Sequence, residues 1–157
     1  MFVRFVLSRY FLLALAVSFL PTGGARAEDD VHISVIGILA TDKNDCVDDR
    51  VACVAREMKK IDPKLTGFSV ARMTCKDVKI GAKDCFEVTD SQKVCVTAEK
   101  RCEKDKSRVC LKVEAPMLGA VTYMTCCGKF FPLVTRYKTK DGEVLIVAVR
   151  VKSCKDE

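Results

Sequence analysis

The chain has 157 residues and a formal charge of +6; 49% of its residues are hydrophobic and 31% are charged. This length is typical of a single domain, and the mixture of apolar and charged residues excludes a disordered polymer. No internal repeat or low-complexity tract occurs, which excludes solenoid and collagen-like chains. Ten cysteines, one histidine and the absence of tryptophan are the unusual features of the composition.

The N-terminal residues have the pattern of a secretory signal peptide. Two arginines precede an apolar run over residues 10–20, and a small-x-small cleavage site follows, ending at Ala27. The run is shorter than the roughly 20 residues of a transmembrane helix. We therefore expect a cleaved signal peptide at residues 1–27 rather than a membrane anchor. Residues 28–157 are expected to form one domain that is periplasmic or secreted.

The rest of the chain is patterned as one helix and a series of strands. Residues 31–40 first alternate and then become apolar on both faces, as in a strand that enters a buried position. Apolar side chains recur at helical spacing over residues 51–61, where Asp48 or Asp49 is available as the N-cap and Pro63 ends the helix. The other strands are expected at residues 67–75, 85–89, 93–99, 107–115, 121–125, 130–138 and 143–152.

These elements predict an α+β domain with one helix packed on a largely antiparallel β-sheet or sandwich that disulfides stabilise. Residues 144–149 are apolar on both faces and should form a central strand. The Asp141-Gly142 pair before them is a hairpin turn signal. Pro132 cannot donate a ladder hydrogen bond, so its strand is expected at an edge or a bulge.

All ten cysteines lie in the expected exported domain, where the compartment is oxidising and an even count favours disulfides. We predict one pairing between Cys46 and Cys53, near the start of the helix, and another between Cys95 and Cys110. Cys102, in the loop between the last two, is the candidate for an unpaired thiol. The candidates for disulfide bonding are Cys46, Cys53, Cys75, Cys85, Cys95, Cys110, Cys126, Cys127 and Cys154.

The pairing of Cys95 with Cys110 depends on the register of one predicted hairpin. Both cysteines alternate with apolar neighbours that face the core, so both should lie on the outward face of the sheet. If Glu99 lies opposite Lys106, Cys95 lies opposite Cys110, at a Cα separation of about 4.5 Å in a non-hydrogen-bonded pair. A slip of one residue would expose the apolar side chains, so the hydrophobic pattern favours this register.

The sequence lacks the patterns of common catalytic and metal sites. No C-x-x-C occurs, so zinc ribbons and thioredoxin-like chemistry are not indicated. His32, the only histidine, falls on the polar face of a predicted strand, and we interpret it as a surface residue rather than the base of a thiol nucleophile. Nucleophile elbows, phosphate-binding loops and H-E-x-x-H are also missing. We expect no catalytic residues, no cofactor and no metal site.

Three segments resemble a known group of proteins: residues 59–68 (KKIDPKLTGF), 128–132 (GKFFP) and 142–149 (GEVLIVAV). Together they resemble a family of small exported bacterial proteins that have no assigned activity. The resemblance covers most of the chain after the signal peptide. It implies a single bacterial α+β domain and brings no catalytic motif with it.

Two functions are compatible with these features. The first is an exported, non-catalytic module, structural or protein-binding, whose partner is an unknown protein or a component of a cell surface. The alternative is a thiol-dependent redox or soft-metal-binding protein that uses Cys126 and Cys127. Because charges of both signs are interleaved, we expect no nucleic-acid binding. We also expect no stable membrane insertion after the signal peptide is removed.

Overall fold

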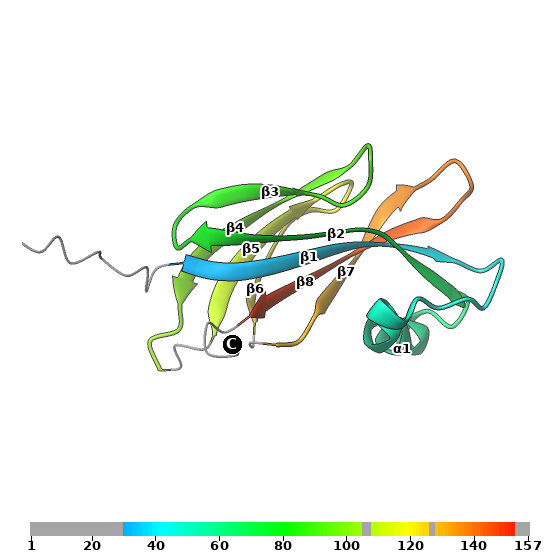
Figure 1. Ribbon diagram of the computed structural model, residues 1–157, viewed down its shortest axis with the longest axis horizontal. Helices are drawn as coiled ribbons and strands as arrows, with labels where there is room; N and C mark the ends of the chain where they lie inside the picture. Colours follow the sequence, from blue (N-terminus) through cyan, green and yellow to red (C-terminus); the bar gives the residue numbers. More distant parts are fainter. Residues whose placement is uncertain (1–29, 105–107, 126–127, 153–157) are drawn as a thin grey trace, which may run out of the picture.

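The computed structural model describes residues 30–104, 108–125 and 128–152, and this part of the chain is mostly β (Figure 1). It contains eight strands in two antiparallel sheets, together with one short helix, α1 (Ala52–Ile61), which follows a 3₁₀ turn, η1 (Asp49–Val51). The strands are β1 (Asp30–Thr41), β2 (Gly67–Lys79), β3 (Lys83–Glu87), β4 (Lys93–Arg101), β5 (Val109–Ala115), β6 (Gly119–Thr125), β7 (Phe131–Lys138) and β8 (Val144–Lys152).

The two sheets differ in strand topology. The first sheet has the strand order β2-β1-β8-β7, so the C-terminal strand β8 lies in the middle, between β1 and β7. The second sheet has the order β3-β4-β5-β6 and is a simple meander. The central place of β8 confirms the prediction made from its apolar character on both faces. Pro132 lies in β7, which is an edge strand as predicted.

The main core lies between the two sheets. Side chains of a strand point alternately to opposite faces, and one face of nearly every strand contributes to this core. Removing such side chains from water is worth about 1.5–3 kcal/mol for each large apolar residue. The buried members are Val31, Ile33, Val35, Val78, Phe86, Val88, Val94, Val96, Ala98, Val109, Leu111, Val113, Ala115, Leu133, Leu145, Val147, Val149 and Val151.

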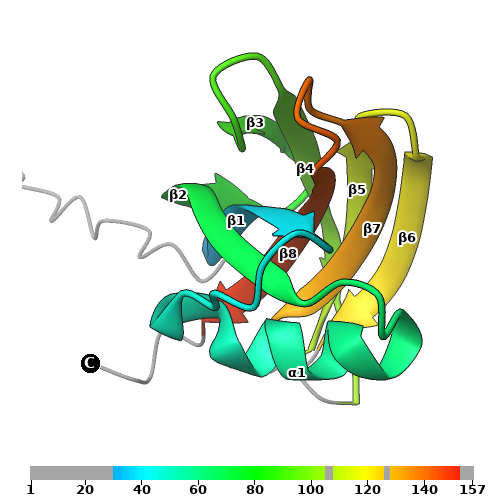
Figure 2. The same cartoon turned by 90° about the vertical axis from the view of Figure 1, so that its right-hand side faces the viewer.

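A second buried cluster lies on the outer face of the first sheet. Figure 2 shows α1 running across the strands of this sheet, at the end of the molecule where β1 finishes. The helix contributes Val54, Ala55 and Met58, which lie on one face of α1, as their helical spacing in the sequence predicted. The other buried members are Ile36, Ile38, Ala40, Val51, Leu65, Phe68, Ile146 and Ala148.

The predicted α+β class needs correction, because strands dominate and the ten-residue α1 is a minor element. The second sheet, rather than the helix, provides the main partner of the first sheet. The prediction of antiparallel strands and of a single helix among the described residues is confirmed, and each predicted strand corresponds to an observed one. The largest difference between predicted and observed strand ends is in β2, which was predicted to end at residue 75. It continues through polar residues to Lys79, because it is an edge strand with an exposed face.

The expected side-chain cap is found on the 3₁₀ turn η1 that precedes the helix, whereas Val51, the N-cap of α1 itself, makes no side-chain cap hydrogen bond. The Asp48 side chain accepts a hydrogen bond from the backbone N–H of Arg50, at 3.0 Å, and so caps η1. Residues 1–27, for which we predicted a signal peptide, lie outside the described residues. Within the described residues, no helix has the length and apolar character needed to cross a bilayer.

The open sides of the sandwich are closed by different contacts. On one side, β6 and β7 lie next to each other (Figure 2). The Tyr123 ring stacks there on the Phe131 ring, with 4.1 Å between the ring centroids. On the other side, β2 and β3 meet through charged and polar side chains. Neither pair of strands is joined by a ladder of backbone hydrogen bonds.

Gly37, near the middle of β1, allows a close approach of the backbone at Val88, the residue that follows β3. A Cβ atom at this position would lie 1.9 Å from the Val88 carbonyl oxygen, which belongs to the backbone and cannot rotate away. The sandwich therefore needs a residue without a side chain here.

We predict that Gly37→Ala lowers the free energy of unfolding by about 2–3 kcal/mol, the upper part of the usual range for overpacking a core, because the clashing atom belongs to the backbone. Gly81→Ala is the matched control. Gly81 has a φ of +85°, but a methyl group added there would have nothing within 4 Å, so only backbone strain of about 1 kcal/mol is expected. Urea unfolding measures both changes. A loss for Gly37→Ala no larger than that for Gly81→Ala would contradict the close approach.

Candidate functional site

Two surface features are candidate functional sites: an exposed hairpin with a disulfide, and a cleft beside the helical segment. The hairpin joins β3 to β4. The Thr89 hydroxyl accepts hydrogen bonds from two backbone amides of the turn, one of them from Gln92 at 3.0 Å. In the strands that flank the turn, Phe86 and Val94 lie opposite each other and are buried in the core. This register places Cys85 opposite Cys95.

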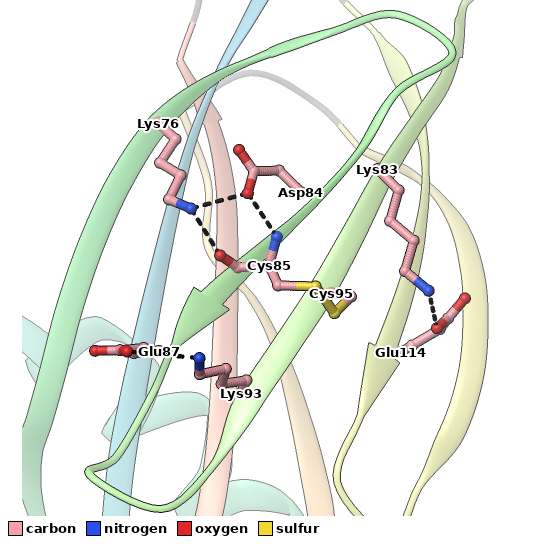
Figure 3. The surroundings of a disulfide bond; sticks show 8 residues. All are labelled: Lys76, Lys83, Asp84, Cys85, Glu87, Lys93, Cys95 and Glu114. Atoms are coloured by element: carbon pink, nitrogen blue, oxygen red, sulfur yellow. Dashed lines mark hydrogen bonds and ion pairs between the residues drawn. A yellow bond between two sulfur atoms is a disulfide. The ribbon is translucent and has the colours of Figure 1, made fainter.

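A disulfide joins Cys85 to Cys95 across the hairpin, with 4.0 Å between the Cα atoms (Figure 3). Cys85 is exposed and Cys95 is half-buried, so the bond lies on the outer face of the second sheet. The sequence contains a signal for this pair that we did not use. If Phe86 and Val94 both face the core on either side of a turn centred on Asp90, Cys85 lies opposite Cys95.

The predicted pairing of Cys95 with Cys110 is wrong. Cys95 lies opposite Glu114, and Cys110 lies opposite Lys100. The hairpin between β4 and β5 turns later than we assumed, and the register shifts between Ala98 and Lys100. Cys110 and the residue opposite Cys95 are four positions apart on β5, roughly 13 Å along a strand. That distance is beyond the reach of a disulfide.

The predicted pairing of Cys46 with Cys53 is also not formed, since both cysteines are unbonded and exposed. The backbone explains this arrangement. The Cys46 carbonyl accepts a hydrogen bond of 2.8 Å from the Phe68 N–H, and the Cys46 N–H donates to the Asn44 side chain at 3.0 Å. These bonds hold the loop against β2 rather than against the helix that carries Cys53.

Three more cysteines are unbonded: Cys75 is exposed, Cys102 is half-buried and Cys110 is buried. The Cys110 thiol lies 3.3 Å from the Glu99 carboxylate. Burial, and then this carboxylate, raise the pKa of the Cys110 thiol, which makes it a poor nucleophile. Cys126, Cys127 and Cys154 lie outside the described residues.

The edge of β3 that faces β2 is satisfied by side chains. The Lys76 ammonium on β2 lies 2.8 Å from Asp84 Oδ1 and 2.7 Å from the carbonyl oxygen of Cys85 (Figure 3). The Thr74 hydroxyl lies 3.3 Å from the carbonyl oxygen of Glu87. Free edge strands are sites of unwanted pairing, so these contacts both join the two sheets and protect β3.

Ion pairs surround the disulfide. Arg72 on β2 binds the carboxylates of Glu87 and Asp90. On the second sheet, Lys83 lies 2.5 Å from Glu114 (Figure 3). The two signs of charge are therefore closely matched around Cys85 and Cys95, and this surface does not present a field of one sign.

His32 lies on the outer face of the first sheet, and its Nδ1 is 2.8 Å from Asp77 Oδ1. Its side chain is 35% exposed. The nearest cysteine in the ladder, Cys75, lies opposite Ser34 and makes its side-chain contact there, at 3.3 Å. In the described ranges, no group of three or more His, Cys, Asp or Glu side chains is arranged to hold a metal ion.

A cleft of about 640 Å³ lies where β1 ends, between the 44–50 loop, the start of β2 and the β7–β8 turn. Val47 pairs with Phe68 in a short parallel bridge, and the Asp48 N–H donates to the Phe68 carbonyl at 2.9 Å. These bonds build one wall of the cleft. The lining residues, which we call the acidic cleft, are Leu39, Thr41, Asn44, Cys46, Val47, Asp48, Asp49, Arg50, Phe68, Ser69 and Glu143.

The acidic cleft already contains one ion pair. The Arg50 guanidinium contacts both oxygens of Asp48, at 3.0 and 2.6 Å. The side chain of Arg50, and then its backbone N–H, lower the pKa of Asp48 to about 2. From the sequence we assigned Asp48 and Asp49 only a capping role. Glu143 is far away along the chain, and only the tertiary fold brings it to the same cleft.

No family model matches the chain, and no curated protein or solved structure matches it either. The resemblance to small exported bacterial proteins therefore stays an expectation from three sequence segments. The hairpin and the cleft are interpreted from their own geometry.

We predict that replacing both disulfide cysteines, Cys85→Ala with Cys95→Ala, lowers the free energy of unfolding by about 2.5 kcal/mol. The bond closes a loop with a sequence separation of 10, slightly shorter than the 15-residue loop worth about 3 kcal/mol. Chemical denaturation with and without dithiothreitol measures this. The reductant should lower the stability of the wild type toward that of the double variant. Cys75→Ala, at an unbonded exposed cysteine, is the control and should shift stability by less than about 0.5 kcal/mol.

A further prediction concerns the ion pair between Lys76 and Asp84. A hydrogen bond from Lys76 is the main cause that lowers the pKa of Asp84 below 3.8. A carboxylate with a lowered pKa stabilises the fold above its unfolded-state pKa, and this contribution is lost as the pH falls through its folded-state pKa. Lys76→Met should therefore be less stable than the wild type at neutral pH, and the difference should shrink below pH 3.8.

Lys93→Met is the control for this experiment, because the Lys93 ammonium lies 3.8 Å from Glu87 in an exposed pair. Its stability should follow that of the wild type across the pH range. A constant difference between Lys76→Met and the wild type at every pH would contradict the role of the ion pair.

Proposed function

We propose that the protein is an exported, non-catalytic module that binds a protein partner, with a β-sandwich stabilised by the Cys85–Cys95 disulfide. The disulfide carries this proposal. It lies on an exposed hairpin, where a cytosolic reducing system would have access to it, and such bonds persist in oxidising compartments. The signal-peptide pattern at residues 1–27 supports the same location, periplasmic or secreted, in a bacterium.

The side-chain chemistry supports binding rather than catalysis. Catalytic sites bring a nucleophile and a base together in a pocket. Cys110 is the described thiol that contacts a carboxylate, and its pKa is raised rather than lowered. His32 pairs with Asp77 on the outer face of the first sheet. The charged groups around the disulfide are paired with one another and stabilise the two sheets.

The alternative, a thiol-dependent redox or soft-metal-binding protein, is favoured by one observation. Five of the described cysteines are unbonded, namely Cys46, Cys53, Cys75, Cys102 and Cys110. A chain that used cysteine only for stability would be expected to pair more of them. In this alternative, Cys126 and Cys127 remain the proposed reactive pair, since soft thiolates suit Cu(I).

Export is tested by producing the full chain in a bacterium and measuring the intact mass of the extracytoplasmic form. We expect a chain that starts at Glu28 and a tryptic map that joins Cys85 to Cys95. A protein that stays in the cytoplasm with residues 1–27 attached would contradict the proposal.

The two functions are distinguished by assays on that exported form. The binding module should neither reduce insulin disulfides in the presence of dithiothreitol beyond the uncatalysed rate nor compete for Cu(I) with a chelator. Activity in either assay that is lost on Cys126→Ser with Cys127→Ser, but not on Cys75→Ser, would establish the alternative instead.

A further inference from the structure

The acidic cleft carries more negative than positive charge. Three carboxylates line it, on Asp48, Asp49 and Glu143, against one guanidinium on Arg50. Asp48 is neutralised by Arg50, with which it forms two close contacts. Lys43, the cation next along the loop, donates to the backbone carbonyl of Asp141 instead of to a carboxylate of the cleft.

Two carboxylates of the acidic cleft therefore have no cationic partner among the described residues. Asp49 is exposed, and no ion pair within the described ranges involves it. Glu143 is half-buried, and its carboxylate contacts a hydroxyl, that of Thr139 at 3.4 Å. Partly desolvated carboxylates attract a cation more strongly than fully hydrated ones, because water screens them less.

The cleft also has apolar walls. Leu39 and Val47 are partly buried and line the same cleft as the carboxylates, whereas the Phe68 side chain is 1% exposed and packs in the cluster under α1. A ligand that fits must therefore be cationic at one end and apolar along its length. The side chains of lysine and arginine have this character, since their methylene stems cover apolar surface while the charged end stays near water or a carboxylate.

The cleft has room for such a side chain. Its volume of about 640 Å³ lies in the range of pockets that bury a small ligand, and this exceeds the size of one lysine or arginine side chain. The acidic lining also contrasts with the net charge of residues 28–157, the expected exported chain, which contains 24 lysines and arginines against 21 aspartates and glutamates, a formal charge of +3. Such a local reversal of sign would guide a basic segment to this end of the molecule and away from the rest of the surface.

We propose that the acidic cleft binds a lysine- or arginine-bearing segment of a protein partner. The charged group of one such side chain reaches Glu143 or Asp49, and its methylene stem packs on Leu39 and Val47. This inference rests on the proposed protein-binding function and identifies the chemistry of the partner.

The test uses the exported protein, labelled for NMR, and two blocked heptapeptides that differ only in their lysines. One contains three lysines, and in the other all three are acetylated. The lysine peptide should shift the amide signals of Val47, Ser69 and Glu143, and binding should weaken as salt increases. Shifts of equal size with the acetylated peptide, or no shifts at these residues, would overturn the proposal.

Variants separate charge from shape. Glu143→Gln and Asp49→Asn should each weaken binding of the lysine peptide about threefold, and the two together about tenfold, as expected for partly exposed ion pairs. Ser69→Tyr should fill the cleft and remove binding, with thermal unfolding used to confirm that the variant is folded. Glu57→Gln is the matched control: Glu57 is an exposed acid on α1 that pairs with Lys60 outside the cleft, so affinity should not change.

Two further measurements exclude other occupants. Cadaverine that bound as tightly as the lysine peptide would overturn the proposal in favour of a small amine. Sedimentation that showed a dimer broken by Glu143→Gln would overturn it in favour of a second copy of this chain. Failure of any of these tests leaves the disulfide and export results intact, so it is distinguishable from failure of the proposed function.

Discussion

Burial of β1 on both faces is the constraint on which the rest of the structure depends. Its first half contributes Val31, Ile33 and Val35 to the core between the sheets, and its second half contributes Ile36, Ile38 and Ala40 to the cluster under α1. A strand with two apolar faces must lie in the middle of a sheet and be covered on both sides. This requirement places β8 and β2 on either side of β1, the second sheet on one face and the helix on the other. Gly37 then allows the second sheet to approach closely enough for the core to close.

The open sides of the sandwich are closed without continuous strand pairing, and this makes side-chain chemistry important for stability. Lys76 bonds to the edge of β3 and to Asp84, so one cation satisfies a backbone carbonyl and a carboxylate together. The disulfide then fixes the same edge strand to β4. A small sandwich with a short, charged and covalently held edge strand is protected against pairing with other chains. These features are compatible with the exported location that we propose.

The acidic cleft arises from the same architecture. Because α1 must lie on the outer face of the first sheet, the chain crosses from the end of β1 to the helix through the 42–48 loop, and the bridge between Val47 and Phe68 holds this loop beside β2. The β7–β8 turn brings Glu143 to the same place. The cleft is therefore a consequence of how the helix is connected, and its charge follows from the acidic residues of the loop and the turn. The disulfide lies on the hairpin of the second sheet, and its cysteines do not line this cleft.

The sequence by itself determined the position of the strands, the position of the helix and the central place of β8, because hydrophobic periodicity and turn residues act over short distances along the chain. It did not determine which strands pair across the two sheets, how far β4 runs before it turns, or which cysteines meet. The predicted register of Cys95 with Cys110 failed because both outward faces had the same alternation in more than one register, and the position of the turn decided between them. The pairing of Cys85 with Cys95 lies within one hairpin, and the core-facing Phe86 and Val94 were a signal for it. In contrast, the cleft that Glu143 and Asp49 both line, and the approach of Val88 to Gly37, depend on contacts between residues far apart in the chain, which only the packing of the tertiary structure decided.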